Sequence, residues 1–358
     1  MSSALVRAVV DTRALRSNLG VVRRLAPRSQ VMAVVKANAY GHGLVPTALA
    51  LADADAFAVA RLDEGITLRH AGVRAPIVIL EGVFDSHQLS EAARHDFEIV
   101  VHSAEQVALL SAWSGKHRFT VWLKVDTGMN RLGFRREAFA AAFAKVKDMK
   151  CVATLRLLTH LADADMPNDT STHEQLRLFE RLTEGLTNER SIANSAGIAA
   201  WPDSHVDWVR PGLMLYGVSP VTGKTGPDLG LQPAMTLVST VIAVKQVLPG
   251  ERVGYGGRWT ARRPTTIAIA AVGYGDGYPR HIANGTPVLV EGQRASVAGR
   301  VSMDMIAVDI TELPPVHAGA SVVLWGKGLP AETVAPHAET IAYELLCGVS
   351  QRVALELR

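Results

Sequence analysis

The stretch Val31-Met-Ala-Val-Val-Lys36-Ala-Asn-Ala-Tyr40-Gly41-His42-Gly43 decides the fold. Five apolar residues come directly before a lysine, and glycines end the segment. An uninterrupted apolar run of this length predicts a strand that is buried on both faces, as in a parallel sheet. The lysine then lies at the carboxyl end of that strand, where parallel α/β folds place their binding sites.

Similar apolar runs alternate with amphipathic segments through the first two thirds of the chain. Eight strand candidates predict a (β/α)8 barrel of the TIM type, and a doubly wound sheet is the alternative. The strand candidates are Val31–Val35, Ala56–Ala60, Pro76–Leu80, Phe97–Val101, Phe119–Val125, Val152–Leu158, Ser191–Ala193 and Val206–Tyr216. The helix candidates are Asp63–Ala71, Asp85–Arg94, Ala104–Trp113, Ala138–Val146 and Thr172–Leu186.

The pattern changes after about Gly230, where strands and glycine-rich turns replace the alternation. We therefore expect a barrel over residues 8–230 and a mainly β C-terminal domain over residues 231–358, with residues 1–7 as a candidate addition to the second domain. The strands expected there are Met235–Val247, Thr265–Val272, Thr286–Val297, Ala320–Trp325 and Val349–Leu357, with one helix at Ala331–Leu346.

Composition narrows the class of protein. The formal charge is +3 over 358 residues without a dense Lys/Arg tract, so neither nucleic acid nor a membrane surface is an expected partner. The N-terminus lacks the apolar run of a signal peptide, which favours a cytoplasmic protein. The two cysteines, Cys151 and Cys347, suggest no disulfide framework or metal site and are expected as buried thiols.

Polar groups follow five of the predicted strands. A lysine in a partly desolvated pocket favours the neutral amine that an aldehyde requires. Ser195 could hold phosphate at a helix N-terminus, and Gly212 would let the backbone approach an anion closely. Each group alone has a structural explanation, such as a helix cap or a buried histidine, but their common position favours a site. These groups are Lys36, Lys124, Asp126, Arg131, His160, Ser195, Arg210, Gly212 and Leu213.

Six segments together resemble the alanine racemase family, in the family's order and across almost the whole chain. The first of them, Ala33–Gly43, closely resembles the cofactor-binding block of that family. The resemblance implies a pyridoxal 5′-phosphate barrel, a β domain and a homodimer with shared active sites that acts on a small amino acid. The other segments are Lys124–Gly133, Val209–Gly217, Val253–Gly257, Gly273–Gly277 and Gly299–Asp304.

The resemblance also assigns the catalytic groups and the cofactor contacts. Lys36 would bind the cofactor and serve as the base for D-alanine, and Tyr255 of the partner subunit would serve L-alanine. His160 and Arg210 would form a chain toward the pyridine nitrogen. The phosphate contacts would be Tyr40, Ser195, Gly212 and Leu213.

Further roles follow from the same blocks. Arg131 and Met303 would contact the substrate, and Lys124 resembles a lysine that many members carry as a carbamate. An unmodified Lys124 beside Asp126 is the alternative. The residues expected at the substrate entrance are Asp165, Tyr274, Arg280 and Arg300.

Two positions depart from the family pattern. Gln351 stands where we expect some members to carry a phosphate-contacting tyrosine, and Ser191 where some carry an entrance histidine. These departures leave a broad-specificity racemase for serine, lysine or arginine as the alternative enzyme. A barrel-type decarboxylase would need a catalytic cysteine block, which neither Cys151 nor Cys347 occupies. A noncatalytic carrier of the cofactor is the alternative outside enzymology, and Tyr255 with the β domain argues against it.

Overall fold

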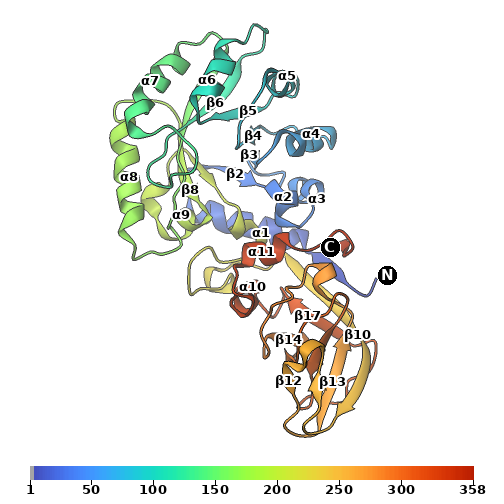
Figure 1. The fold of residues 1–358 in the computed structure, drawn as a ribbon. Coiled ribbons are helices and arrows are strands. Elements are labelled where there is room, and N and C mark those ends of the chain that lie inside the picture. Colours follow the sequence, from blue (N-terminus) through green and yellow to red (C-terminus); the bar gives the residue numbers. More distant parts are fainter. Residues whose placement is uncertain (1–3) are drawn as a thin grey trace.

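The computed structural model describes residues 4–358. Its first domain is a closed barrel of parallel strands in the order β2 to β9, closed by the pairing of Gln30 in β2 with Trp208 in β9. The predicted (β/α)8 fold is thereby confirmed over a doubly wound sheet (Figure 1). The strands are β2 Gln30–Val34, β3 Ala56–Val59, β4 Ile77–Ile79, β5 Glu98–Val101, β6 Phe119–Lys124, β7 Val152–Leu158, β8 Arg190–Asn194 and β9 Trp208–Arg210.

Helices surround the barrel and explain why its strands are apolar on both faces. Val31, Met32 and Ala33 of β2 are all fully buried, one face against the barrel interior and the other against helices. The helices are α1 Thr12–Leu25, α2 Lys36–Tyr40, α3 Leu44–Ala50, α4 Leu62–His70, α5 Ser86–Arg94, α6 Ala104–Ser111, α7 Arg136–Lys147, α8 Thr170–Thr183 and α9 Ser195–Ala200, with short turns η1 Pro202–Ser204, η2 Leu213–Tyr216 and η3 Pro227–Leu229.

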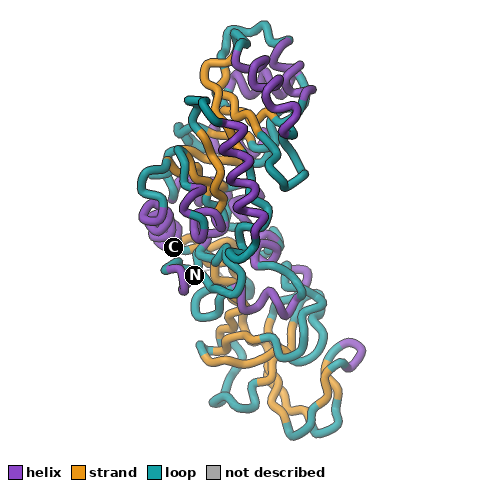
Figure 2. Tube along the Cα trace, turned by 90° about the vertical axis from the view of Figure 1, so that its left-hand side faces the viewer, coloured by secondary structure: helices purple, strands orange, loops and turns teal. Residues whose placement is uncertain are grey.

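The second domain is an eight-stranded sheet in the order β13-β16-β15-β14-β17-β10-β1-β18, which confirms the predicted mainly β domain. Figure 2 shows it below the barrel along the long axis of the molecule. A separate two-stranded ribbon, β11 Arg252–Val253 and β12 Trp259–Thr260, flanks the turn η4 Tyr255–Gly257. The sheet strands are β1 Arg7–Val10, β10 Met235–Val247, β13 Thr265–Ala270, β14 Pro287–Val290, β15 Gln293–Val297, β16 Ile306–Asp309, β17 Ser321–Trp325 and β18 Ala354–Leu357.

The first strand of the described chain belongs to the second domain. β1 pairs antiparallel with β10 and parallel with β18, so it lies between them in the sheet. The expected domain boundary placed residues 8–10 in the barrel, and the pairing places them in the sheet instead. Of the expected addition at residues 1–7, the first three lie outside the described residues.

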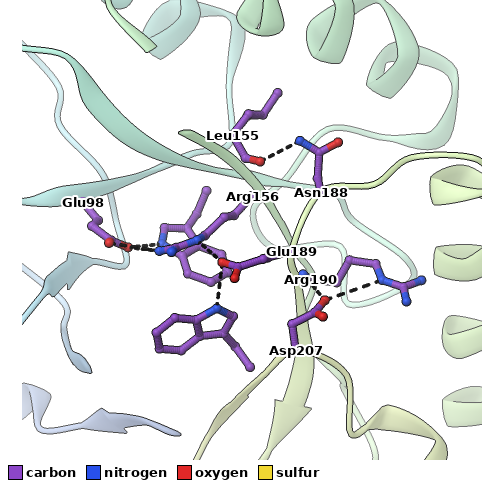
Figure 3. A network of polar contacts seen from close by, with 9 residues as sticks. Glu98, Leu155, Arg156, Asn188, Glu189, Arg190 and Asp207 are labelled. Atoms are coloured by element: carbon purple, nitrogen blue, oxygen red, sulfur yellow. Dashed lines mark hydrogen bonds and ion pairs between the residues drawn. The ribbon is translucent and has the colours of Figure 1, made fainter. Parts of the chain in front are cut away.

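A compact polar layer fills the N-terminal end of the barrel (Figure 3). Arg156 of β7 lies 3.0 Å from the Glu98 carboxylate and 2.5 Å from that of Glu189. Its guanidinium carbon is 5.1 Å from the ring centroids of both Trp122 and Trp208. The indole N–H groups donate to the same carboxylates, Trp122 to Glu98 and Trp208 to Glu189. Charge, ring faces and hydrogen-bond donors are therefore mutually satisfied in this layer.

Several predicted elements were too long, including the last strand, which spans only β18 Ala354–Leu357 instead of Val349–Leu357. The strand expected over residues 206–216 ends at Arg210, because Pro211 cannot donate to the ladder and η2 follows. The strand expected over residues 286–297 is a hairpin, β14 and β15, which turns at Glu291 and Gly292 with positive φ. The helix expected over residues 331–346 is divided into α10 Ala331–Val334, η6 Ala335–Ala338 and α11 Ala342–Cys347, with Pro336 at the break.

The expected burial of the cysteines is wrong. Cys347 ends α11 and is exposed, because Leu345 and Leu346 take the buried positions of that helix, and Cys151 is half-buried. Within residues 4–358, no helix has both the length and the apolarity needed to cross a bilayer. The same residues contain no group of three or more His, Cys, Asp or Glu side chains placed to bind a metal ion.

Candidate active site

The carboxyl ends of the barrel strands enclose a cavity of about 360 Å³. Nine residues that the sequence singled out line it, although they are spread over residues 36–213. Parallel strands in a closed barrel bring their carboxyl ends together at one rim, which is why these distant residues meet. The nine are Lys36, Tyr40, Lys124, Arg131, His160, Ser195, Arg210, Gly212 and Leu213.

Lys36 reaches the cavity from a strained turn at the end of β2. The four residues after it, from Ala37 to Tyr40, all have positive φ, between 51° and 54°. A left-handed conformation costs a non-glycine residue about 1–2 kcal/mol, and such strain concentrates at functional sites. The turn places Lys36 and Tyr40 on the same cavity. Burial and the nearby charge of Arg131 lower the pKa of Lys36, which favours its neutral amine.

The cavity is strongly cationic. Lys36, Lys124, Arg131 and Arg210 line it, whereas the carboxylate among its lining residues is that of Glu81. Burial, followed by the charges of Arg210 and Arg131, lowers the pKa of Lys124 to about 8. Cations that are buried together without matching anions destabilise one another, so the cavity is suited to an anionic ligand.

Arg210 is the most deeply buried of these cations. Its guanidinium donates to Ser191 Oγ and the Thr159 carbonyl, both at 2.6 Å, and to the Ile192 carbonyl at 3.1 Å. Burial lowers the pKa of Arg210 to about 9. His160 Nδ1 lies 3.3 Å from Arg210 Nη2, and burial with the Arg210 charge lowers the pKa of His160 well below its ordinary value. His160 is therefore neutral and accepts at Nδ1.

A wall of backbone and hydroxyl groups closes the side of the cavity next to Tyr40. Ser195 Oγ accepts hydrogen bonds from the amides of Gly212 at 2.8 Å and Met214 at 3.3 Å. A Cβ atom at position 212 would lie 2.6 Å from Tyr40 Oη, so only glycine lets the backbone and the phenol approach this closely. The wall combines hydroxyls with amides beside the start of α9, which is a suitable environment for phosphate.

Other predicted site residues lie on the β domain and outside this cavity. Tyr255 is 68% exposed and Met303 is 52% exposed, and Tyr274 is also exposed. Arg300 lines a separate groove of that domain. Arg280 is also not among the residues that line the cavity. Large exposed apolar side chains on one domain are typical of a surface that a partner covers. The single chain therefore does not bring these residues to Lys36.

Asp165 lines a second cavity, of about 630 Å³, that adjoins the first. Arg131, His160, Leu213 and Tyr343 are shared by the two cavities. The position of Asp165 is compatible with an outer chamber that leads to the inner one.

The structure shows where the two positions that depart from the family pattern lie. Tyr343 lines the inner cavity, with its ring centroid 5.7 Å from that of Tyr40, whereas Gln351 is exposed and outside it. The ring of Tyr343 therefore lies at this wall, a position that the sequence alone did not assign to it. Ser191 is fully buried beneath Arg210 and does not lie at an entrance.

The fold and the cavity define a two-domain barrel protein with a lysine-containing, cationic site at the carboxyl ends of its strands. Family models described as "Alanine racemase, N-terminal domain" and "Alanine racemase, C-terminal domain" match residues 10–220 and 234–357. The chain belongs to the alanine racemase family of isomerases.

Individual relatives agree with this placement. The chain is 49% identical over 350 residues to "Alanine racemase, biosynthetic" of Escherichia coli (strain K12), covering 97% of this chain and 98% of that protein. Among solved structures, it resembles the biosynthetic alanine racemase from Pseudomonas aeruginosa with a TM-score of 0.96 and 44% identity over 99% of both chains. The alanine racemase from D-cycloserine-producing Streptomyces lavendulae matches with a TM-score of 0.91 and 36% identity, over 100% of this chain and 98% of that one.

Proposed function

We propose that this chain interconverts L-alanine and D-alanine by a two-base mechanism, with pyridoxal 5′-phosphate held at Lys36. The observation that carries the proposal is the meeting of Lys36 with Tyr40, Ser195 and Arg210 in one cationic cavity. The names of the relatives support alanine as the substrate. We further infer a cytoplasmic homodimer whose D-alanine is used for peptidoglycan.

The residues of the cavity fit this cofactor. Gly212 leaves room that any Cβ would fill, and Ser195, Tyr40 and the amides at Gly212 and Leu213 would hold the phosphate. Arg210 would face the pyridine nitrogen with His160 behind it. When bound, the cofactor supplies the electron sink that makes the substrate Cα–H acidic enough to ionise.

Lys36 has the properties of a base on one face of the substrate. Its lowered pKa raises the fraction of neutral amine, which is the form that binds an aldehyde and the form that accepts a proton. We assign to it the proton at Cα of D-alanine. Because racemisation returns the proton to the opposite face, a second group is required there.

Tyr255 of a second copy is that group in our proposal. In its own chain this tyrosine is 68% exposed on a different domain from the cavity. A phenol serving as a base must be near a cation or a hydrogen-bond donor, and the cationic cavity of another copy supplies both. Met303 of that copy would lie by the substrate, and its Tyr274, Arg280 and Arg300 would form the entrance with Asp165.

The remaining cations would orient the substrate and limit side reactions. Arg131 would hold the substrate carboxylate. Arg210 keeps its proton, so it would donate to the pyridine nitrogen and leave that atom unprotonated, which limits side reactions such as transamination. A neutral amine at Lys124 reacts with CO₂, and a carbamate there would orient Arg131. Electron density beyond Lys124 Nζ would demonstrate the carbamate, and its absence from crystals grown with bicarbonate would exclude it.

The test is incubation of cofactor-loaded protein with L-alanine in D₂O. The proposal requires D-alanine with deuterium at Cα, together with borohydride trapping of the cofactor on Lys36. Exchange with serine, lysine or arginine but not alanine would assign a different racemase, and binding without exchange would leave a carrier. Tyr255→Phe should slow exchange of L-alanine by orders of magnitude more than Tyr274→Phe does, since a base typically contributes about 10²–10⁴-fold.

A further inference from the structure

His42 is a buried titratable residue that the proposed mechanism does not use. It is fully buried and lies two residues after Tyr40, just beyond Gly41 at the end of the left-handed turn. Its Nδ1 lies 3.0 Å from the Ala39 carbonyl and 2.9 Å from the Tyr40 carbonyl. Both neighbours are acceptors, so Nδ1 carries the hydrogen and donates to the strained turn.

Rings continue this contact toward the cavity. The His42 ring centroid is 4.5 Å from that of Tyr216, which in turn is 4.7 Å from that of Tyr40. Tyr216 is fully buried, and its hydroxyl donates to the Val34 carbonyl at 2.9 Å. The column His42–Tyr216–Tyr40 is therefore anchored to the end of β2, and its last member carries the hydroxyl that meets Gly212.

We propose that His42 and Tyr216 are positioning residues for the phosphate end of the cofactor, because they hold the Tyr40 hydroxyl at the wall of Gly212. The turn from Ala37 to Tyr40 is intrinsically unfavourable and persists only if its surroundings fix it. The imidazole N–H stabilises its last two carbonyls, and Tyr216 limits the direction of the Tyr40 ring. Without either contact, the Tyr40 hydroxyl would sample positions away from the phosphate.

The inference rests on the proposed function, and the experiment separates the two. Apoprotein is titrated with pyridoxal 5′-phosphate, and the dissociation constant is measured for wild type, His42→Phe, Tyr40→Phe and the double variant. His42→Phe keeps a ring and removes the N–H donor. We expect each single variant to weaken binding about tenfold, the size of one lost hydrogen bond, and the double variant to be no weaker than either.

A purely structural role would give a different result. In that case the losses in the double variant would multiply, and this outcome would overturn the inference while leaving the proposed function intact. His42→Asn, which retains an amide donor, should restore binding toward the wild-type value, and no such rescue is expected from a structural role. The ³¹P resonance of the bound phosphate should shift in His42→Phe as it does in Tyr40→Phe.

Two further outcomes are decisive. Failure of the wild-type protein to bind the cofactor would overturn the proposed function before any variant is compared. If His42→Phe does not fold, Tyr216→Phe replaces it in the cycle, since it keeps every ring and removes only the hydroxyl bond to Val34. Multiplicative losses with Tyr40→Phe would then overturn the inference in the same way.

Discussion

The two ends of the barrel hold arginines in opposite electrostatic surroundings. At the N-terminal end, Arg156 is neutralised by Glu98 and Glu189 (Figure 3). At the carboxyl end, the hydrogen bonds recorded for Arg210 within residues 4–358 go to neutral acceptors, such as Ser191 Oγ. One layer is complete within the chain, and the other would be completed by the anionic cofactor that we propose. We therefore expect the first layer to contribute to the stability of the fold and the second to contribute mainly to ligand binding.

The strands connect the two layers directly. Trp208 and Arg210 are two residues apart on β9, and Trp122 and Lys124 are two residues apart on β6, so each pair shares a face of its strand. Arg156 touches both tryptophans. The satisfied layer thus lies beneath the cationic one on the same strands.

The largest effect on stability is expected at the N-terminal end of the barrel, where Arg156 is neutralised. Arg156→Met should lower the free energy of unfolding by about 3–5 kcal/mol, because Glu98 would be left as a largely buried charge, and Glu189 as a partly buried one, without a cation. Urea denaturation of the apoprotein measures this. Arg94→Met, which breaks an exposed pair with Glu91, should cost about 1 kcal/mol or less. Equal losses in the two variants would contradict the comparison.

A smaller effect is expected from the unneutralised lysine at the other end. The pKa of Lys124 is about 8 in the folded chain and 10.5 ordinarily, so the unfolded chain binds more protons between these values. Stability should therefore rise with pH through this window, by about 3 kcal/mol relative to Lys124→Met. Urea denaturation in CO₂-free buffers from pH 7 to 11 tests the difference. Parallel curves for wild type and Lys124→Met would show that Lys124 is not destabilised.

Binding of an anionic ligand at the carboxyl end should raise the stability of the apoprotein independently of the Arg156 layer. Pyridoxal 5′-phosphate at one hundred times its dissociation constant should raise the stability of the apoprotein by about 2.7 kcal/mol, and pyridoxal at the same concentration by less. The gain should be the same in Arg156→Met, because the two layers share no side chain. A gain that disappears in Arg156→Met would mean that the layers are coupled.

The smallest effect concerns the neutral acceptors of Arg210. Ser191→Ala removes the acceptor at 2.6 Å and leaves a buried guanidinium N–H unsatisfied, at a cost of about 1–2 kcal/mol. Ser90→Ala, at an exposed hydroxyl of α5, is the control. The loss of unfolding free energy in Ser191→Ala should be smaller with bound cofactor than without it. An equal loss in both states would show that the anion does not compensate for the missing acceptor.

Sequence reasoning found the carboxyl end of the barrel but not the N-terminal end. Polar residues at the ends of apolar runs, such as Lys36 and Arg210, predict a shared site because strand ends converge in a barrel. Arg156 and Glu98 gave no such signal, because pairing across the barrel interior depends on register. The place of Tyr343 in the cavity could not be predicted either, since a predicted continuous helix does not show which residue turns toward the cavity. The partnership of β1 with β18 joins residues too distant in sequence for any local pattern to show.

That partnership has a mechanical consequence. β1 and β18 are parallel neighbours, with Arg7 opposite Ala354 and Val10 opposite Leu357. A force that pulls residue 7 and residue 358 apart would load all the hydrogen bonds between these strands at once, in shear, instead of opening them one after another. The molecule would then resist stretching between its ends as a clamp does, and the barrel would feel no tension until the clamp gave way.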